Sequence, residues 1–155
     1  MNALARLALV ALLGAGSAGA QEVRVVEDEL PVEEMTDIDL ADYIWVKRPV
    51  VVFADSPFDP AFVRQMELLR EREDALAERD VVILTDTDPA AQSSLRTTLR
   101  PRGFMLVLIG KDGGIKLRKP FPWDVRELTR SIDKMPMRQQ ELRDDRAAQE
   151  PELDD

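Results

Sequence analysis

The sequence contains neither cysteine nor histidine among its 155 residues. A chain without cysteine forms no disulfide of its own and has no thiol nucleophile or redox pair. The lack of histidine removes the most common general base, the usual zinc ligand and every catalytic triad that depends on an imidazole. Together the two absences exclude thiol–disulfide exchange, thiol peroxidase chemistry and histidine-based hydrolysis for this chain.

Positive charge is also scarce, because 30 acidic residues stand against 21 basic ones and give a formal net charge of −9. A negative surface repels phosphate backbones and anionic lipid headgroups. We therefore expect no nucleic-acid partner. The charge itself carries no information about the fold.

The first 20 residues have the pattern of a secretory signal peptide. Arg6 precedes the apolar stretch Leu7–Leu13, and Ala18-Gly19-Ala20 provides the small residues of a cleavage site. The apolar stretch is too short to span a membrane as an anchor. Cleavage after Ala20 would leave a mature chain beginning at Gln21, which we expect to be periplasmic or secreted and to have no membrane span.

The remaining chain divides by composition into three parts. Residues 21–36 are acidic and form either a linker or an edge strand, for which Val23–Val26 supplies the apolar positions. Residues 37–136 hold the apolar runs of one domain. Residues 137–155 carry much charge and little apolar content, which predicts a short helical extension that frays into a disordered tail.

The segment Arg48–Phe62 is the centre of the predicted domain. Val50–Phe53 is a continuous β-branched and aromatic run, as in a strand that is covered on both faces. Asp59-Pro60 is a strong helix start, because Asp59 accepts hydrogen bonds from free amides and Pro60 has no amide to leave unpaired. The sequence thus predicts a strand–loop–helix corner at the carboxyl end of a central strand, where ligands usually bind in open α/β sheets.

The apolar runs that follow complete an α/β sheet with helices. Helical crossovers make the first two strands parallel, and the glycine-rich turn Gly110–Gly114 predicts a final hairpin. In the last helix, we expect Leu128 to face the sheet and Thr129 to face solvent. The predicted fold is a central mixed sheet of about four to five strands flanked by helices. The strands and helices after the corner are Val81–Leu84, Ala90–Leu99, Phe104–Ile109, Ile115–Lys119 and Asp124–Met135.

This order of strands and helices resembles the thioredoxin-like fold. Proteins of that fold keep their reactive cysteines at the corner that here reads Ala54-Asp55-Ser56-Pro57-Phe58-Asp59. Alignment of the Asp112-Gly113 turn places Phe104 at the position of their cis-proline. The resemblance implies the fold, but both redox landmarks are missing, so the redox activity is not carried over.

A closer resemblance is to the bacterial family catalogued as domain of unknown function 4174, which is similar to a domain in the sushi-repeat-containing extracellular proteins of animals. It depends on three segments between Leu40 and Met135, namely Trp45–Phe53, Glu78–Val82 and Gly110–Arg118. None of these segments is a catalytic signature. The resemblance implies the thioredoxin-like fold and a place outside the cytoplasm, and it implies no activity.

Residues that follow the predicted strands should gather at one end of the sheet and form a surface for binding a protein or small ligand. The aspartates and the serine among them are more typical of turns and helix caps. The two nearby arginines would either contact the ligand or form only a surface ion-pair cluster of little energetic value. We expect a non-catalytic binding domain with no catalytic residue, cofactor or metal. The candidate binding residues are Asp55, Ser56, Phe58, Asp59, Asp86, Asp88, Arg100, Arg102, Phe104 and Trp123.

Two other functions stay open at this point. A carboxylate-based or metal-assisted hydrolase would use Asp55, Asp59 and Asp86, provided that their surroundings separate their pKa values. With Asp88, these residues would offer oxygen ligands to Ca²⁺ or Mg²⁺, although their spacing matches no EF-hand. A chaperone-like or adhesion role would need an exposed groove lined by aromatic side chains. We instead expect large aromatic residues such as Trp45 to pack in the core or beside the strand.

Overall fold

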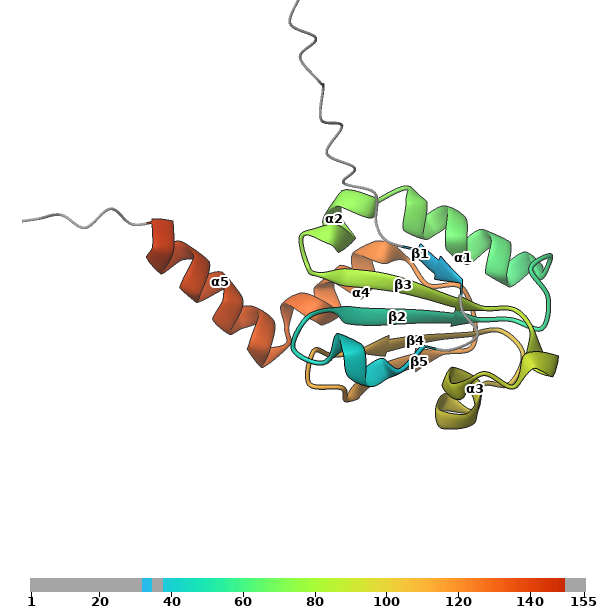
Figure 1. Cartoon of the computed structure of the whole chain (residues 1–155). Coiled ribbons are helices and arrows are strands. Elements are labelled where there is room, and N and C mark those ends of the chain that lie inside the picture. Colours follow the sequence, from blue (N-terminus) through green and yellow to red (C-terminus); the bar gives the residue numbers. More distant parts are fainter. Residues whose placement is uncertain (1–31, 35–37, 150–155) are drawn as a thin grey trace, which may run out of the picture.

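The computed structural model describes residues 32–34 and 38–149. The predicted signal peptide, the valines at 23–26 and residues 150–155 lie outside the described residues. Five strands form one sheet, and helices cover both of its faces (Figure 1). In chain order the elements are β1 (Val32–Glu34), the 3₁₀ helix η1 (Leu40–Tyr43), β2 (Arg48–Phe53), α1 (Pro60–Arg70), α2 (Glu73–Ala77), β3 (Val81–Asp86), the 3₁₀ helix η2 (Pro89–Ala91), α3 (Ser94–Leu99), β4 (Met105–Ile109), β5 (Ile115–Lys119), α4 (Val125–Asp133) and α5 (Pro136–Gln149).

The strands are arranged in the order β1-β3-β2-β4-β5. β1 and β2 each run parallel to β3, whereas β4 is antiparallel to β2 and β5 is antiparallel to β4. The predicted mixed sheet and the predicted hairpin are therefore confirmed. The edge strand beside β3 is Val32–Glu34, which lies within the segment that the sequence left as linker or edge strand.

Every residue of the central strand β2 is buried, as its continuous apolar run predicts. Pro49 has no amide to donate, and this costs no hydrogen bond at the start of β2. The amide of Arg48 donates to Asp80 C=O on the β3 side at 2.7 Å. Since amides alternate in direction along a strand, the missing amide of Pro49 would face β4, whose pairing with β2 starts only at Val50.

Successive residues of the strands enter two apolar cores, one on each face of the sheet. One core holds Val50 and Leu106 under α1 and α4, and the other holds Val51 and Val107 under η1 and α3. Leu128 of α4 is fully buried in the first core, as predicted. Such burial of alternate residues on both faces is what a covered sheet requires.

The prediction that Thr129 faces solvent is wrong, because only 8% of this residue is exposed. The buried residues of α4 are Val125, Leu128, Thr129 and Ile132. Their spacing of three and four residues defines a stripe wide enough to include Thr129. Its hydroxyl donates to Arg126 C=O at 3.0 Å, so the polar atom is satisfied without water.

The expectation for Trp45 is also wrong, since 67% of this residue is exposed. Its backbone has a φ of 67°, in the left-handed region. Its amide donates to Lys111 C=O at 2.7 Å, which ties the end of η1 to the hairpin. The indole of Trp45 therefore lies outside both apolar cores.

Two helical segments differ from the sequence prediction in length. The helix expected over Ala90–Leu99 divides into η2 and α3, because Gln92 adopts a left-handed φ of 46° and Ser93 starts a new helix. At the other end of the chain, α5 has 14 residues and exceeds the short extension that we expected. Pro136 stands at its first position, where the missing amide costs no hydrogen bond. In the described part of the chain, no helix is both long and apolar enough to cross a bilayer.

Candidate functional site

The carboxyl ends of the central strands meet at the corner that the sequence predicts. Phe53 at the end of β2 pairs with Asp86 on one side and with Met105 on the other. A Cβ atom placed on Gly103 would lie 4.0 Å from Asp55 Oδ2. The start of β4 therefore lies beside the loop Asp55–Asp59, as the thioredoxin-like alignment predicts.

A buried ion pair occupies this corner. Arg96 Nε donates to Asp86 Oδ1 at 2.8 Å, and the side chains of the two residues are 11% and 4% exposed. Arg96 Nη2 donates to the carbonyls of Ala54 and Asp86 at 2.6 and 3.1 Å, so one guanidinium bridges the ends of β2 and β3. Ser93 Oγ donates to the second carboxylate oxygen of Asp86. We call Ala54, Asp86, Ser93 and Arg96 the corner cluster.

The corner cluster is held by its own secondary structure. Ser93 Oγ also accepts the Arg96 amide at 3.1 Å and so caps α3. The guanidinium lies 5.5 Å from the centre of the Phe53 ring. Asp86 Oδ1 accepts a further hydrogen bond from the amide of Asp88 at 3.2 Å. A buried carboxylate that is paired and hydrogen-bonded in this way is a structural group, since it has little capacity left to bind a ligand or take up a substrate proton.

The loop after β2 shows the turn and cap roles that its composition favours. Asp59 accepts the amides of Ala61 and Phe62 at 2.8 and 3.3 Å and caps α1. Ser56 Oγ accepts the amide of Phe58 at 3.2 Å. Asp55 is exposed, and the ring of Phe58 projects into solvent with 86% of the residue exposed. Asp88 has the same role in η2, where it accepts the amide of Ala90 at 3.0 Å.

The other four candidates separate into surface and core. Arg100 and Arg102 are exposed, and within the described residues no ion pair joins either one to an acid. Phe104 is only 8% exposed and belongs to the core under α1 and α4. Trp123 is half-buried, and its backbone exchanges two hydrogen bonds with the fully buried amide side chain of Gln65 at 2.7 and 3.1 Å.

The geometry does not support the cation site or the hydrolase that the sequence left open. Among residues 32–34 and 38–149, no group of three or more acidic side chains is placed to hold a metal ion. The Asp86 carboxylate accepts hydrogen bonds from Arg96 and Ser93, and the Asp59 carboxylate accepts a backbone amide at the start of α1. Of the three carboxyls that the hydrolase hypothesis would use, Asp59 caps a helix and Asp86 lies in a buried ion pair, so only Asp55 is without a structural partner among the described residues.

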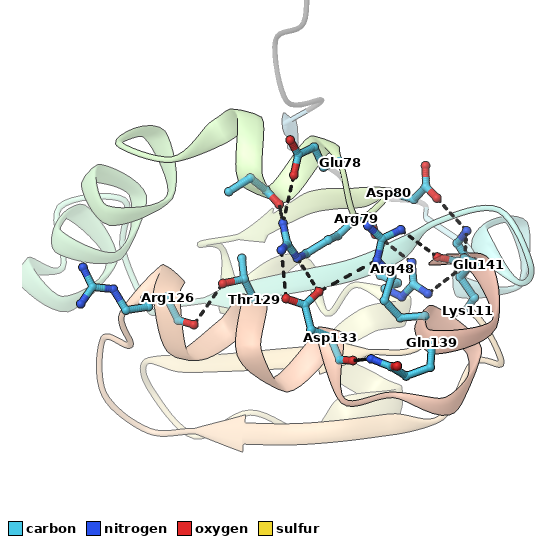
Figure 2. Close-up of polar contacts among 12 residues, drawn as sticks. Arg48, Glu78, Arg79, Asp80, Lys111, Arg126, Thr129, Asp133, Gln139 and Glu141 are labelled. Atoms are coloured by element: carbon cyan, nitrogen blue, oxygen red, sulfur yellow. Dashed lines mark hydrogen bonds and ion pairs between the residues drawn. The ribbon is translucent and has the colours of Figure 1, made fainter. Parts of the chain in front are cut away.

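A second polar cluster lies at the opposite, amino end of β2 (Figure 2). Glu141 of α5 accepts hydrogen bonds from Arg48 Nη2 at 2.8 Å and from Arg138 Nη1 at 3.2 Å, and it pairs with Lys111 Nζ at 2.8 Å. We call Arg48, Lys111, Arg138 and Glu141 the amino-end cluster. It fastens α5 to the first residue of β2 and to the hairpin turn.

Charge dominates the amino-end cluster. Burial alone would raise the pKa of Glu141, but hydrogen bonds from Arg48, Lys111 and Arg138 outweigh it and lower the pKa from 4.5 to about 2. Arg48 is fully buried, yet its Nε and the Nε of Arg138 have no hydrogen-bond partner. Each orphaned donor costs free energy. Ion pairs therefore hold α5 against the domain, although two buried donors beside them make no hydrogen bond.

An adjoining pair ties α4 to the start of β3. Arg79 meets Asp133 through two parallel hydrogen bonds, Nε to Oδ1 at 2.8 Å and Nη2 to Oδ2 at 2.9 Å. The hydrogen bond with Asp133 raises the pKa of Arg79, despite the partial burial that lowers it. Arg48 Nη1 donates to Arg79 C=O at 2.9 Å and links the pair to the amino-end cluster.

Sequence reasoning singled out Asp86 but missed its partners Ser93 and Arg96, and it missed the amino-end cluster. Arg48 stands directly before a buried run, and a charge there requires a partner. The sequence thus indicated that Arg48 needs an acidic partner. It did not indicate Glu141, which lies 93 residues away, because no spacing rule connects the two residues. Arg96 follows the cap residue Ser93 by three residues, yet arginine in a short helix usually faces solvent.

Comparison with protein families agrees with this fold. The family described as domain of unknown function (DUF4174) matches residues 39–141, so the match runs from η1 to the glutamate of the amino-end cluster. No curated protein matches the chain.

Several solved structures share the fold at low sequence identity. A Plasmodium yoelii thioredoxin peroxidase I is 17% identical with a TM-score of 0.54, over 66% of this chain and 80% of that one. A reduced Plasmodium vivax 2-Cys peroxiredoxin is 16% identical with a TM-score of 0.55, over 66% and 85%. Chloroplastic thioredoxin z is 20% identical with a TM-score of 0.51, over 68% and 97%. The fold of this cysteine-free chain is thus thioredoxin-like.

Proposed function

Since the chain belongs to the family described as domain of unknown function (DUF4174), whose description states no activity, we propose that it is a non-catalytic binding module with a thioredoxin-like fold that acts outside the cytoplasm. A fold of this kind hosts many functions, so the site must decide among them. The module would bind a protein or a small ligand, and its chemistry would be limited to recognition.

The observation that carries this proposal is the corner cluster. Where the thioredoxin-like alignment places reactive thiols, Arg96 spans the ends of two strands and neutralises Asp86. A general acid or nucleophile must have a proton or lone pair free for the substrate. The buried groups at this corner are directed at one another instead, which supports a structural role for the corner and a binding role for its rim.

The rim of the corner offers side chains that the fold does not need. Phe58 is 86% exposed, and Arg102 is exposed with no ion pair inside the described residues. Aromatic rings and arginines are both residue types that protein interfaces favour. These two residues are therefore the first positions to test for partner contact.

The proposed location depends on the pattern of the first 20 residues. Arg6, the apolar stretch Leu7–Leu13 and the small residues before Gln21 are typical of a cleaved export signal. Intact-mass analysis of protein recovered outside the cytoplasm should give the mass of a chain that begins at Gln21. A mass that retains residues 1–20 would contradict cleavage.

The proposed function is tested by two measurements on the purified mature chain. Insulin reduction, peroxide consumption and a panel of chromogenic esters, phosphates and glycosides, with and without Mg²⁺ or Ca²⁺, should show no turnover above buffer. In parallel, a pull-down from periplasmic extract should retain a defined partner that Phe58→Ser/Arg102→Glu loses and Arg72→Glu does not. Turnover in any assay, or identical retention by all three proteins, would overturn the proposal.

A further inference from the structure

Lysine is concentrated on one side of the molecule. The sequence has five lysines, at positions 47, 111, 116, 119 and 134. All but Lys47 line two adjoining cavities beside β5, which share Lys116, Met135 and Pro136. One cavity of about 220 Å³ reaches Arg48 and Lys111, and the other, of about 560 Å³, reaches Lys119, Trp123 and Lys134. We call Lys111, Lys116, Lys119, Trp123, Lys134 and Met135 the lysine groove.

Lys116 reaches the groove because of a bulge in the hairpin. Leu108 pairs with Leu117, but Ile109 pairs with Ile115, so Lys116 is the extra residue on β5. A bulge redirects a side chain relative to the regular alternation of a strand. Gly110 leaves room for this side chain, since a Cβ atom there would lie 2.5 Å from Lys116 Cε.

The charges of the groove are only partly balanced. Lys116 pairs with Asp112 at 2.8 Å, and Lys111 pairs with Asp80 and Glu141 at 2.7 and 2.8 Å. Lys119 has its ammonium 4.6 Å from the centre of the Trp123 ring. Within the described residues, neither Lys119 nor Lys134 forms an ion pair, so two positive charges are available in a chain whose net charge is −9.

β5 also offers backbone groups for pairing. It is the last strand of the sheet and pairs with β4 alone among the described strands (Figure 1). Edge strands often carry cations that discourage accidental pairing, and Lys116 and Arg118 fit that role. Edge protection does not require Lys134, which comes from the end of α4 and faces the same cavity as Lys119.

We propose that the lysine groove binds an acidic, extended peptide segment, which adds to β5 as a further strand. Alternate side chains of such a strand would point into the cavity between β5 and α4. Carboxylates there would meet Lys119 and Lys134, and apolar side chains would pack against Trp123 and Met135. The inference rests on the proposed binding function and gives it a surface and a partner of stated chemistry.

The probe is a fluorescein-labelled peptide of about ten residues, a length suited to one strand. Every second residue is Glu or Val in turn and the residues between them are Thr, so one face presents both carboxylates and apolar side chains to the cavity. Fluorescence anisotropy with the mature chain should show saturable binding. Lys119→Glu/Lys134→Glu should raise the dissociation constant at least about tenfold, since it replaces two attractions by repulsions. The matched control Arg72→Glu/Arg126→Glu changes the net charge equally at two exposed arginines outside the groove, and it should change the constant by less than about twofold.

A second probe separates strand addition from simple charge attraction. The same peptide, N-methylated at the alternate amides that would face β5, keeps its charge but loses the backbone donors on that edge, so it should bind at least about tenfold more weakly. Equal binding of both peptides, equal loss in both double variants, or full competition by citrate at equal carboxylate concentration would overturn the inference. Absence of peptide binding would also overturn it, while the proposed non-catalytic function would still stand or fall on the turnover and pull-down measurements.

Discussion

The two ends of the sheet handle buried charge in different ways. The corner cluster joins Asp86 to Arg96, ten residues away, and the carboxylate there accepts hydrogen bonds from Arg96, Ser93 and the amide of Asp88. The amino-end cluster joins Arg48 to Glu141, 93 residues away, and leaves the Nε atoms of Arg48 and Arg138 without a hydrogen-bond partner. The corner ion pair joins residues that are close in sequence, and its carboxylate is fully hydrogen-bonded. The amino-end ion pair joins residues that are distant in sequence, and two of the arginine nitrogens there lack a hydrogen bond.

This difference indicates which end of the sheet can open locally at lower free energy. The corner cluster closes through the backbone of two central strands, so opening it would disturb the whole sheet. The amino-end cluster holds a terminal helix in which Arg138 is the single buried residue among those described. Elements with few buried contacts open at lower free energy than core strands. We therefore expect the corner to resist perturbation and α5 to respond to it.

Removal of Arg96 should have the largest effect of the changes considered. Arg96→Ala would leave Asp86 buried without its partner and should destabilise the protein by about 3–5 kcal/mol. Urea denaturation followed by tryptophan fluorescence measures this change. The matched control Arg102→Ala removes an exposed arginine and should cost less than about 0.5 kcal/mol. Similar small losses from both variants would remove the distinction between the two ends.

Acid should loosen the amino-end cluster. The folded-state pKa of Glu141 is depressed to about 2, so its contribution to stability is present above the ordinary value of 4.5 and is lost as pH falls towards 2. A depression of this size corresponds to about 3 kcal/mol at neutral pH, and solvent screening of this partly exposed carboxylate reduces the contribution to on the order of 1–2 kcal/mol. Denaturation at a series of pH values should show the decline between these limits, and Glu141→Gln should flatten it. Unchanged acid sensitivity in Glu141→Gln would assign the decline to another group.

The smallest effect is expected at the rim of the corner. Phe58→Ser removes a ring that is 86% exposed, so the free energy of unfolding should change by less than about 0.5 kcal/mol. The result would separate the rim, which is free to bind, from the cluster beneath it, which holds the fold. A loss above about 1 kcal/mol would show that the rim is structural as well.

Local patterns predicted the parts of the fold that depend on neighbouring residues. The apolar run of β2, the cap at Asp59 with Pro60, and the glycine turn before β5 each follow from the residues themselves. The corner between β2, β3 and β4 followed from the order of these elements. The roles of Asp59 and Asp88 as caps were also predictable, since aspartate is a preferred N-cap residue and proline is favoured at the helical position that follows it.

The rest depended on partners that are distant in sequence. No pattern near Arg48 indicates Glu141 as its partner. The α5 segment reads as a charged tail in the sequence, because the pairing of Glu141 with Arg48 and Lys111 exists only in the folded domain. Thr129 was misplaced because a polar residue on the margin of a helical stripe gives no signal of burial. Trp45 was misplaced because its left-handed turn is stabilised by a carbonyl of the distant hairpin.

The central claim is that Asp86 and Arg96 at the corner pair with each other and stabilise the fold. A double-mutant cycle tests this claim most directly. Arg96→Met, Asp86→Asn and the double variant would be unfolded in urea, and the coupling free energy calculated from the three changes. We predict a coupling of at least about 1.5 kcal/mol, as for a buried hydrogen-bonded pair. A coupling below about 0.5 kcal/mol would contradict the claim, because Asp86 and Arg96 would then be independent groups available for a ligand or a substrate.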